Sequence, residues 1–121
     1  MVLVDTSVWV AHFREGNDGL AAALDKGEVL SHLFIIGELA CGNLKNRREI
    51  LGLLQTLPRA AEASHEEAIR LIELRRLAGI GLGYIDVHLL ASALITGEAL
   101  WSLDRTLNAA AEKLGVSYKE A

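Results

Sequence analysis

The chain has 121 residues, of which 51% are hydrophobic and 23% are charged, and this balance excludes an intrinsically disordered protein. Its length suits a domain with a core of its own, so we expect residues 1–121 to form a single domain. The one cysteine, Cys41, has no partner for an internal disulfide, and no Cys/His cluster predicts a zinc site.

The apolar stretches of the chain predict neither export nor a membrane span. The first residues lack the basic stretch and the long apolar run of a signal peptide. The longest apolar region, 87–100, contains Glu98 and is shorter than a bilayer requires. We therefore expect a soluble, cytoplasmic protein with no membrane partner.

The net charge of −4 weighs against a nucleic-acid partner, but this total hides how the charges are distributed. If several acids share one metal site, the bound ions offset them and the remaining surface can still be basic. Two basic runs are candidate nucleic-acid contacts, although a solvated helix face is the ordinary explanation of each. They are Lys45, Arg47 and Arg48 in the first half of the chain, and Arg70, Arg75 and Arg76 in the second.

In the first half of the chain, short β-rich runs alternate with stretches of helical periodicity. The chain opens with a run of Val and Leu that is short enough to be a buried strand. Gly27 and Pro58 mark the ends of predicted helices. In chain order we expect a strand at 2–4, helices at 6–14 and 18–26, a strand at 29–30, and helices at 32–41 and 47–57.

The second half begins with a strong helix start, in which Ser64 is the cap and Glu67 completes a capping box. This helix is predicted to run to 77–78 and to end at Gly79, with Arg75 inside its apolar arc. A flexible connection over 79–83 follows, because its glycine spacing and its place after a helix do not fit a dinucleotide-binding loop. The remaining expected elements are helices at 86–96 and 105–114 and strands at 100–103 and 116–118.

Strands that alternate with helices predict an α/β domain with a mainly parallel sheet. Ligands bind such sheets outside the carboxyl ends of the strands. Asp5 directly follows the first strand and Asp104 directly follows the strand that contains Trp101, so both belong to that edge. Asp86 heads the longest apolar helix, and Glu38 interrupts an apolar helical run.

Three of these acids can be explained without a catalytic or metal-binding role. Asp5, Asp86 and Asp104 all precede predicted helices, where Asp is a preferred N-cap. Glu38 is different, because a carboxylate in the middle of an apolar helix gains nothing from capping and is costly to bury alone. It therefore needs a partner, and Arg75 or a metal ion are the two candidates.

Taken together, the four acids predict a metal site. Carboxylates within about 5 Å of one another repel by about 3 kcal/mol per pair at an effective dielectric near 20. Protons or cations must neutralise such a cluster. Ligands that offer only oxygen select hard ions, so we expect Mg²⁺ or Mn²⁺, which suit phosphodiester hydrolysis.

Four segments occur in the order seen in PIN-domain proteins, and the chain resembles most closely the VapC toxins of bacterial and archaeal toxin–antitoxin pairs. These segments are Val4-Asp5-Thr6-Ser7-Val8-Trp9, the isolated Glu38, the run from Ile85-Asp86-Val87-His88 to Ala93, and Leu100-Trp101-Ser102-Leu103-Asp104. The resemblance covers essentially the whole chain. In one position Ser102 stands where threonine is more usual, which keeps the hydroxyl group.

The resemblance implies a three-layer α/β/α fold and a Mg²⁺- or Mn²⁺-dependent endoribonuclease. By that resemblance Asp5, Glu38, Asp86 and Asp104 bind one or two metal ions and form the catalytic site, supported by Thr6, Ser7 and Ser102. It further implies an RNA substrate such as tRNA or rRNA, a VapB-like antitoxin whose tail covers the catalytic groove, and a homodimer. Operator DNA is bound only through the antitoxin.

Two other functions are compatible with parts of this pattern. A phosphoacceptor receiver domain has similar length and topology, but it needs an acidic pair after its first strand, where Asp5 stands alone. A PIN-like module that binds RNA or protein without catalysis is the more serious rival, and the presence of all four acids argues against it.

Beside Asp86, His88 is expected to pack or to form a hydrogen bond, and Trp9 and Trp101 are expected in the core.

Overall fold

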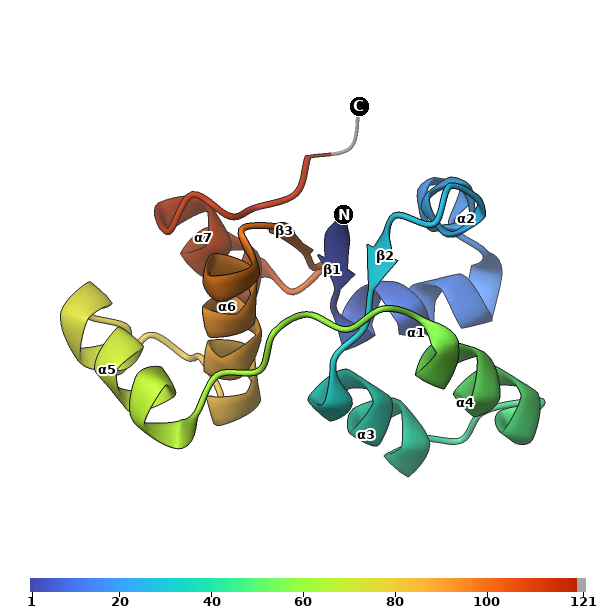
Figure 1. Ribbon diagram of the computed structural model, residues 1–121, viewed down its shortest axis with the longest axis horizontal. Helices are drawn as coiled ribbons and strands as arrows, with labels where there is room; N and C mark the ends of the chain where they lie inside the picture. Colours follow the sequence, from blue (N-terminus) through green and yellow to red (C-terminus); the bar gives the residue numbers. More distant parts are fainter. Residues whose placement is uncertain (120–121) are drawn as a thin grey trace.

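The computed structural model describes residues 1–119 as a small parallel sheet with helices on both sides (Figure 1). The strands are β1 (Val2–Val4), β2 (Val29–Leu30) and β3 (Ala99–Trp101). The helices are α1 (Thr6–Glu15), α2 (Asp18–Asp25), α3 (Leu33–Cys41), α4 (Arg47–Thr56), α5 (His65–Arg75), α6 (Tyr84–Thr96) and α7 (Arg105–Lys113). Helices α1 to α4 lie on one side of the sheet and α5 to α7 on the other, which confirms the three-layer α/β expectation.

The strand order β2-β1-β3 places the first strand in the middle of the sheet. The chain leaves β1 toward β2 on one side and later returns to β3 on the other side, so the direction of winding reverses at β1. In parallel sheets, such a reversal opens a crevice at the carboxyl end of the central strand. Asp5 is the residue at that point.

Single residues extend the sheet by one parallel bridge on each side. Ser31 pairs with Arg59 beyond β2, and Ser117 pairs with Leu100 of β3. The expected strand at 116–118 is therefore only this bridge, and the strand expected at 100–103 ends at Trp101. The chain turns away after Trp101 because Ser102 and Asp104 bond with side chains and backbone of the site and not with a neighbouring strand.

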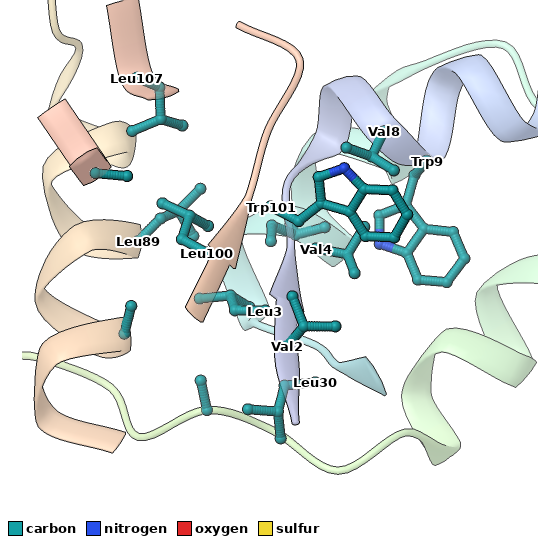
Figure 2. Packing of buried hydrophobic residues seen from close by; sticks show 14 of the residues in the cluster. Val2, Leu3, Val4, Val8, Trp9, Leu30, Leu89, Leu100, Trp101 and Leu107 are labelled. Carbon is teal, nitrogen blue, oxygen red and sulfur yellow. The ribbon is translucent and has the colours of Figure 1, made fainter. Parts of the chain in front are cut away.

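The core forms on both faces of the sheet, as alternation along a strand requires (Figure 2). On one face, Leu3 and Leu100 meet Leu89 of α6, and all three side chains are fully buried. On the other face, Val4 and Trp101 lie with Trp9 of α1. Each fully buried Leu or Val contributes about 1.5–3 kcal/mol, and these contacts fix the ends of β1 and β3 relative to one another.

Helix α5 begins as predicted, with the reciprocal capping box of Ser64 and Glu67, but it ends at Arg75 and not at 77–78. Arg76 adopts a left-handed conformation with φ 55°, and the Leu77 amide then donates to the carbonyl of Ile72. This closure turns Leu77 into the core, where it is buried. It leaves Arg75 exposed, so the placement of Arg75 inside an apolar arc was wrong.

Within residues 1–119, no helix combines the length and the apolar character that crossing a bilayer requires.

Candidate functional site

The register of β1 and β3 brings Asp5 beside Ser102. Val4 pairs with Trp101, so the residues that follow them are neighbours at the carboxyl edge of the sheet. The Asp5 amide donates to the Trp101 carbonyl at 2.9 Å, and the Ser102 hydroxyl donates to Asp5 Oδ2 at 2.9 Å. Asp5 is only 7% exposed, and two residues 97 positions apart in the chain meet there because the strands are parallel.

Two hydroxyl groups hold the same carboxylate oxygen of Asp5. Ser7 Oγ donates to Asp5 Oδ2 at 2.7 Å, in addition to the bond from Ser102. Each hydroxyl also accepts a backbone N–H from the turn after β3: Leu103 N donates to Ser7 Oγ and Asp104 N donates to Ser102 Oγ, both at 2.9 Å. The network therefore fixes the Asp5 carboxylate and the backbone that carries Asp104 together.

Asp104 is the N-cap of α7, and its Oδ1 accepts from the Leu107 amide at 2.9 Å. Asp5 is likewise the N-cap of α1, with Oδ2 accepting from the Ser7 amide at 3.4 Å. For these two residues the capping explanation and the site explanation are both correct. One carboxylate oxygen caps a helix in each residue, and capping sets the direction in which the other oxygen points.

Asp86 is not an N-cap but the third residue of α6, where its Oδ2 accepts from the Gly83 amide at 3.0 Å. Burial raises the pKa of Asp86 above its usual value, and the charges of Asp5 and Asp104 raise it further. The Gly83 bond opposes this rise because it favours the ionised form. Asp5 and Asp104 are thus close enough to Asp86 for their charges to affect its pKa.

Glu38 lies on an exposed part of α3, so the expectation that it is buried was wrong. The core face of α3 is formed by Ile35, Ile36 and Leu39, and Glu38 projects beside that face. Its partner is Thr6, whose Oγ1 donates to Glu38 Oε1 at 2.8 Å. Thr6 directly follows Asp5, and this bond brings Glu38 to the same edge of the sheet.

The site has carboxylate oxygens that could bind a cation, but they do not form a complete coordination sphere. Within residues 1–119, no hydrogen bond engages Asp5 Oδ1, Asp86 Oδ1 or Asp104 Oδ2, so each aspartate keeps one oxygen free. In the same part of the chain, no group of three or more His, Cys, Asp or Glu side chains is arranged to hold a metal ion. Mutual repulsion favours such a spread arrangement of carboxylates. Mg²⁺ commonly uses one or two carboxylates and keeps its waters, so the donor set still fits it.

The basic residues named from the sequence have different surroundings. The Arg47 guanidinium caps the carboxyl end of α3, where it donates to the carbonyls of Ala40 and Gly42. Arg75 is on the surface, and its backbone carbonyl accepts from Lys113 Nζ at 3.1 Å. The only ion pair in the described chain joins the Met1 amine to Glu98, so Arg75 is not the partner of Glu38.

A groove of about 680 Å³ extends from the site along α1. Thr6 and Glu38 line the groove, and so does Arg14, which lies about two turns after Thr6 along α1. Phe13 and Leu39 are among the apolar residues that line it. The groove is therefore continuous with the carboxylate edge, and it combines apolar walls with basic side chains.

A cluster of histidines lies behind the site, between α3 and α6, and sequence reasoning gave it little weight. His32 caps α3 through Nδ1, which accepts from the Phe34 amide, so its Nε2 carries the proton and bonds to Ser92 Oγ at 3.1 Å. His88 is 4% exposed and packs edge-on against Phe34 and Tyr84, and its Nε2 has no hydrogen-bond partner among the described residues. Burial lowers the pKa of both histidines. The expected packing role of His88 is confirmed.

Comparison with known proteins shows that nearly the whole chain matches one family. The family model described as the PIN domain matches residues 2–113, which include every carboxylate discussed above. A solved structure, the crystal structure of PAE2754 from Pyrobaculum aerophilum, superposes with a TM-score of 0.60. The match covers 89% of this chain and 77% of that one at 20% sequence identity, which is a likeness of fold.

Two curated relatives are similar over their full lengths. Both are named Ribonuclease VapC32 and come from Mycobacterium tuberculosis, one from strain CDC 1551 / Oshkosh and one from strain ATCC 25618 / H37Rv. Each is 43% identical to this chain over 121 residues, and the match spans 99% of this chain and 98% of the relative.

Proposed function

Because the chain belongs to the PIN-domain family and, within it, to the VapC ribonucleases, we propose that its carboxylate edge hydrolyses RNA phosphodiester bonds. Residues 1–121 act in this proposal as one PIN domain and as the toxin of a toxin–antitoxin pair. The catalytic and metal-binding residues are Asp5, Glu38, Asp86 and Asp104, with Thr6, Ser7 and Ser102 in support.

The observation that carries the proposal is the orientation of Asp5 at the point where the sheet reverses its winding. Two hydroxyls hold Oδ2, and Oδ1 has no hydrogen bond from the described residues. A helix cap needs one acceptor oxygen, and the other four bonds of the network go beyond what capping requires. Positioning of this kind around one carboxylate is characteristic of a ligand site.

The donor set supports Mg²⁺ or Mn²⁺ as the cofactor. Within residues 1–119, Asp5, Asp86 and Asp104 each keep one carboxylate oxygen without a hydrogen bond, and hard ions prefer oxygen ligands. Such an ion, when bound, supplies an activated water and positive charge against the phosphate. The chain contributes orientation of Asp5 through Ser7 and Ser102, and Thr6 holds Glu38 at the same edge of the sheet.

The partners follow from family membership. We propose an RNA substrate, with tRNA and rRNA as the two classes to test, and a VapB-like antitoxin. The groove along α1 supports the antitoxin, because its apolar walls and Arg14 suit a peptide tail that reaches Glu38 and Thr6. A homodimer, and binding of operator DNA through the antitoxin, are further parts of the proposal.

The test is cleavage of tRNA and of rRNA by the purified chain with Mg²⁺ or Mn²⁺ and with EDTA. We expect cleavage that requires the metal and that Asp5→Asn abolishes. Asp25→Asn is a matched control, because Asp25 ends α2 at the opposite edge of the sheet from the site. Binding of RNA without cleavage in any metal would establish the rival function, a PIN-like module that lacks catalysis.

A further inference from the structure

A second group of basic residues begins at the site and follows α7 away from it. Arg105 and Lys113 stand at the two ends of α7, and Arg75 and Arg76 end α5 beside Lys113. All four side chains are exposed. We call these four residues the α7 track.

Contacts connect the members of the α7 track. Lys113 Nζ donates to the Arg75 carbonyl at 3.1 Å, which joins the end of α7 to the end of α5. Arg105 and Lys113 line one hollow of about 350 Å³, together with Thr106 and Ile80. Arg105 and Lys113 are eight positions apart, which is about 12 Å along the helix at 1.5 Å per residue, so the track is longer than a single phosphate.

The track is continuous with the carboxylate edge at two points. Arg105 directly follows Asp104, the N-cap of α7. The loop that leads into Asp86 also borders the track, since a Cβ at Gly81 would lie 3.6 Å from the Thr106 methyl group. A chain that leaves the aspartates in this direction therefore meets Arg105 first and Lys113 next.

The charges of the track are not balanced within the described chain. None of the four cations forms an ion pair there, and Glu112 is the one acid within α7. Four cations side by side repel one another, in a protein whose net charge is −4. A polyanion that spans the whole track would relieve this repulsion, and single-stranded RNA places one phosphate at every nucleotide.

We propose that the α7 track binds the phosphate backbone of the RNA on one side of the cut. This inference rests on the proposed ribonuclease function, since it treats Asp104 as part of the cleavage site. RNA is preferred to an acidic protein as the occupant because the track starts at the residues proposed to cut a phosphodiester bond. In this proposal the four residues position the RNA backbone relative to the cleavage site, and the carboxylates carry out the hydrolysis.

The experiment measures how the affinity for a single-stranded RNA changes with salt concentration. Each cation that contacts a phosphate contributes about 0.7 to the slope of log affinity against log salt for a single strand. We expect Arg105→Gln and Lys113→Gln each to lower that slope by about 0.7, and the double variant to lower it by about 1.4. In cleavage assays the KM should rise, whereas kcat at saturating RNA should stay unchanged.

Two controls make the result specific. Lys26→Gln removes a cation at the end of α2, before the amino end of β2 and away from the site, and should leave the slope unchanged. Arg105→Lys keeps the charge and should keep the slope, while thermal melts verify that each variant is folded. A slope change in Lys26→Gln as large as in Lys113→Gln would overturn the proposal.

The failure of the track and the failure of the proposed function are distinguishable. If the wild-type chain cleaves the same RNA with Mg²⁺ but the slopes of the variants match the wild type, only the track is wrong. Unchanged RNA slopes with weakened binding of an acidic antitoxin peptide would assign the track to a protein partner and also overturn it. Absence of any cleavage by the wild type would instead refute the ribonuclease function.

Discussion

Asp5 and Asp86 lie at the same edge of the sheet, but the protein treats the two carboxylates differently. Asp5 is almost fully buried and accepts bonds from the hydroxyls of Ser7 and Ser102. Asp86 accepts one bond, from the Gly83 amide, and its pKa is raised by burial and by the neighbouring aspartates. Hydrogen bonds from the chain therefore orient the Asp5 carboxylate, whereas the surroundings of Asp86 make its ionised form energetically unfavourable.

Under the proposed function, this difference divides the site between an oriented carboxylate and one whose negative charge is costly in the absence of a cation. The bonds to Asp5 involve residues of α1 and of the turn after β3, so its orientation is built when the sheet forms. The charge of Asp86 is costly first because the carboxylate is partly buried and then because Asp5 and Asp104 repel it, and a bound cation would lower this cost. The predictions that follow test this division between an oriented carboxylate and one under repulsion.

The largest effect is expected for Asp5→Asn. The substitution keeps the shape and the cap of α1 but removes the charge from the oriented position. Loss of a residue that only supports a metal ligand costs about 10- to 100-fold, and we expect loss of Asp5 to exceed ~100-fold in kcat/KM. The melting temperature should stay close to that of the wild type. Substantial activity in a folded Asp5→Asn variant would show that Asp5 has no catalytic role.

Removing one of the supporting hydroxyls should have a smaller effect. Ser102→Ala deletes a donor to Asp5 and an acceptor for the Asp104 amide. We expect kcat/KM to fall about 10- to 100-fold, the range found for groups that orient metal ligands. Ser102→Thr keeps the hydroxyl and should retain most of the activity. Equal activities of the Ala and Thr variants would contradict the orienting role.

Adding metal should stabilise the protein through the charge at Asp86. A tenfold excess of Mg²⁺ or Mn²⁺ over its Kd adds about 1.4 kcal/mol to the free energy of unfolding by linkage. In Asp86→Asn this gain should be smaller, because one negative ligand has been lost. Melting curves with metal and with EDTA measure both effects. A melting temperature that metal leaves unchanged in the wild type would argue against any cation site.

The smallest effect is expected in the pH dependence of stability, compared between the wild type and Asp86→Asn in the absence of metal. The folded pKa of Asp86 lies above its ordinary value of 3.8, so the folded state binds more protons in that window. Stability from this group is present below pH 3.8 and is lost as the pH rises through the folded pKa. In EDTA, the Asp86→Asn variant should therefore gain stability relative to the wild type as the pH rises from about 3.8.

His32 and His88 affect the stability in the opposite direction as the pH changes, and they provide an internal reference. The pKa values of His32 and His88 are lowered from 6.5, mainly by burial, so their contribution is lost as the pH falls below 6.5. Both proteins share this loss, and the difference between wild type and Asp86→Asn removes it. If the two curves stayed parallel from pH 3.8 upward, neither burial nor the charges of Asp5 and Asp104 would raise the pKa of Asp86 in the folded protein.

Local patterns in the sequence predicted most elements but placed some boundaries incorrectly. The predicted strands at 2–4 and 29–30 and the capping box of Ser64 follow from apolar runs and cap chemistry, and the structure contains them. The end of α5 depends instead on Leu77 entering the core after a left-handed Arg76, which periodicity does not show. The partner of Glu38 was likewise missed because Thr6 is 32 positions away.

The sequence by itself determined which residues could form a site, because an acid after a short apolar strand must lie at the carboxyl end of that strand. Asp5 and Asp104 were placed at one edge in this way. Only the tertiary structure decided how they are held: the pairing of Val4 with Trp101 brings Ser102 to Asp5. The physical reason is that apolar patterning is a local property of the chain. Hydrogen bonds and charge repulsion between distant residues exist only after β1 and β3 have paired.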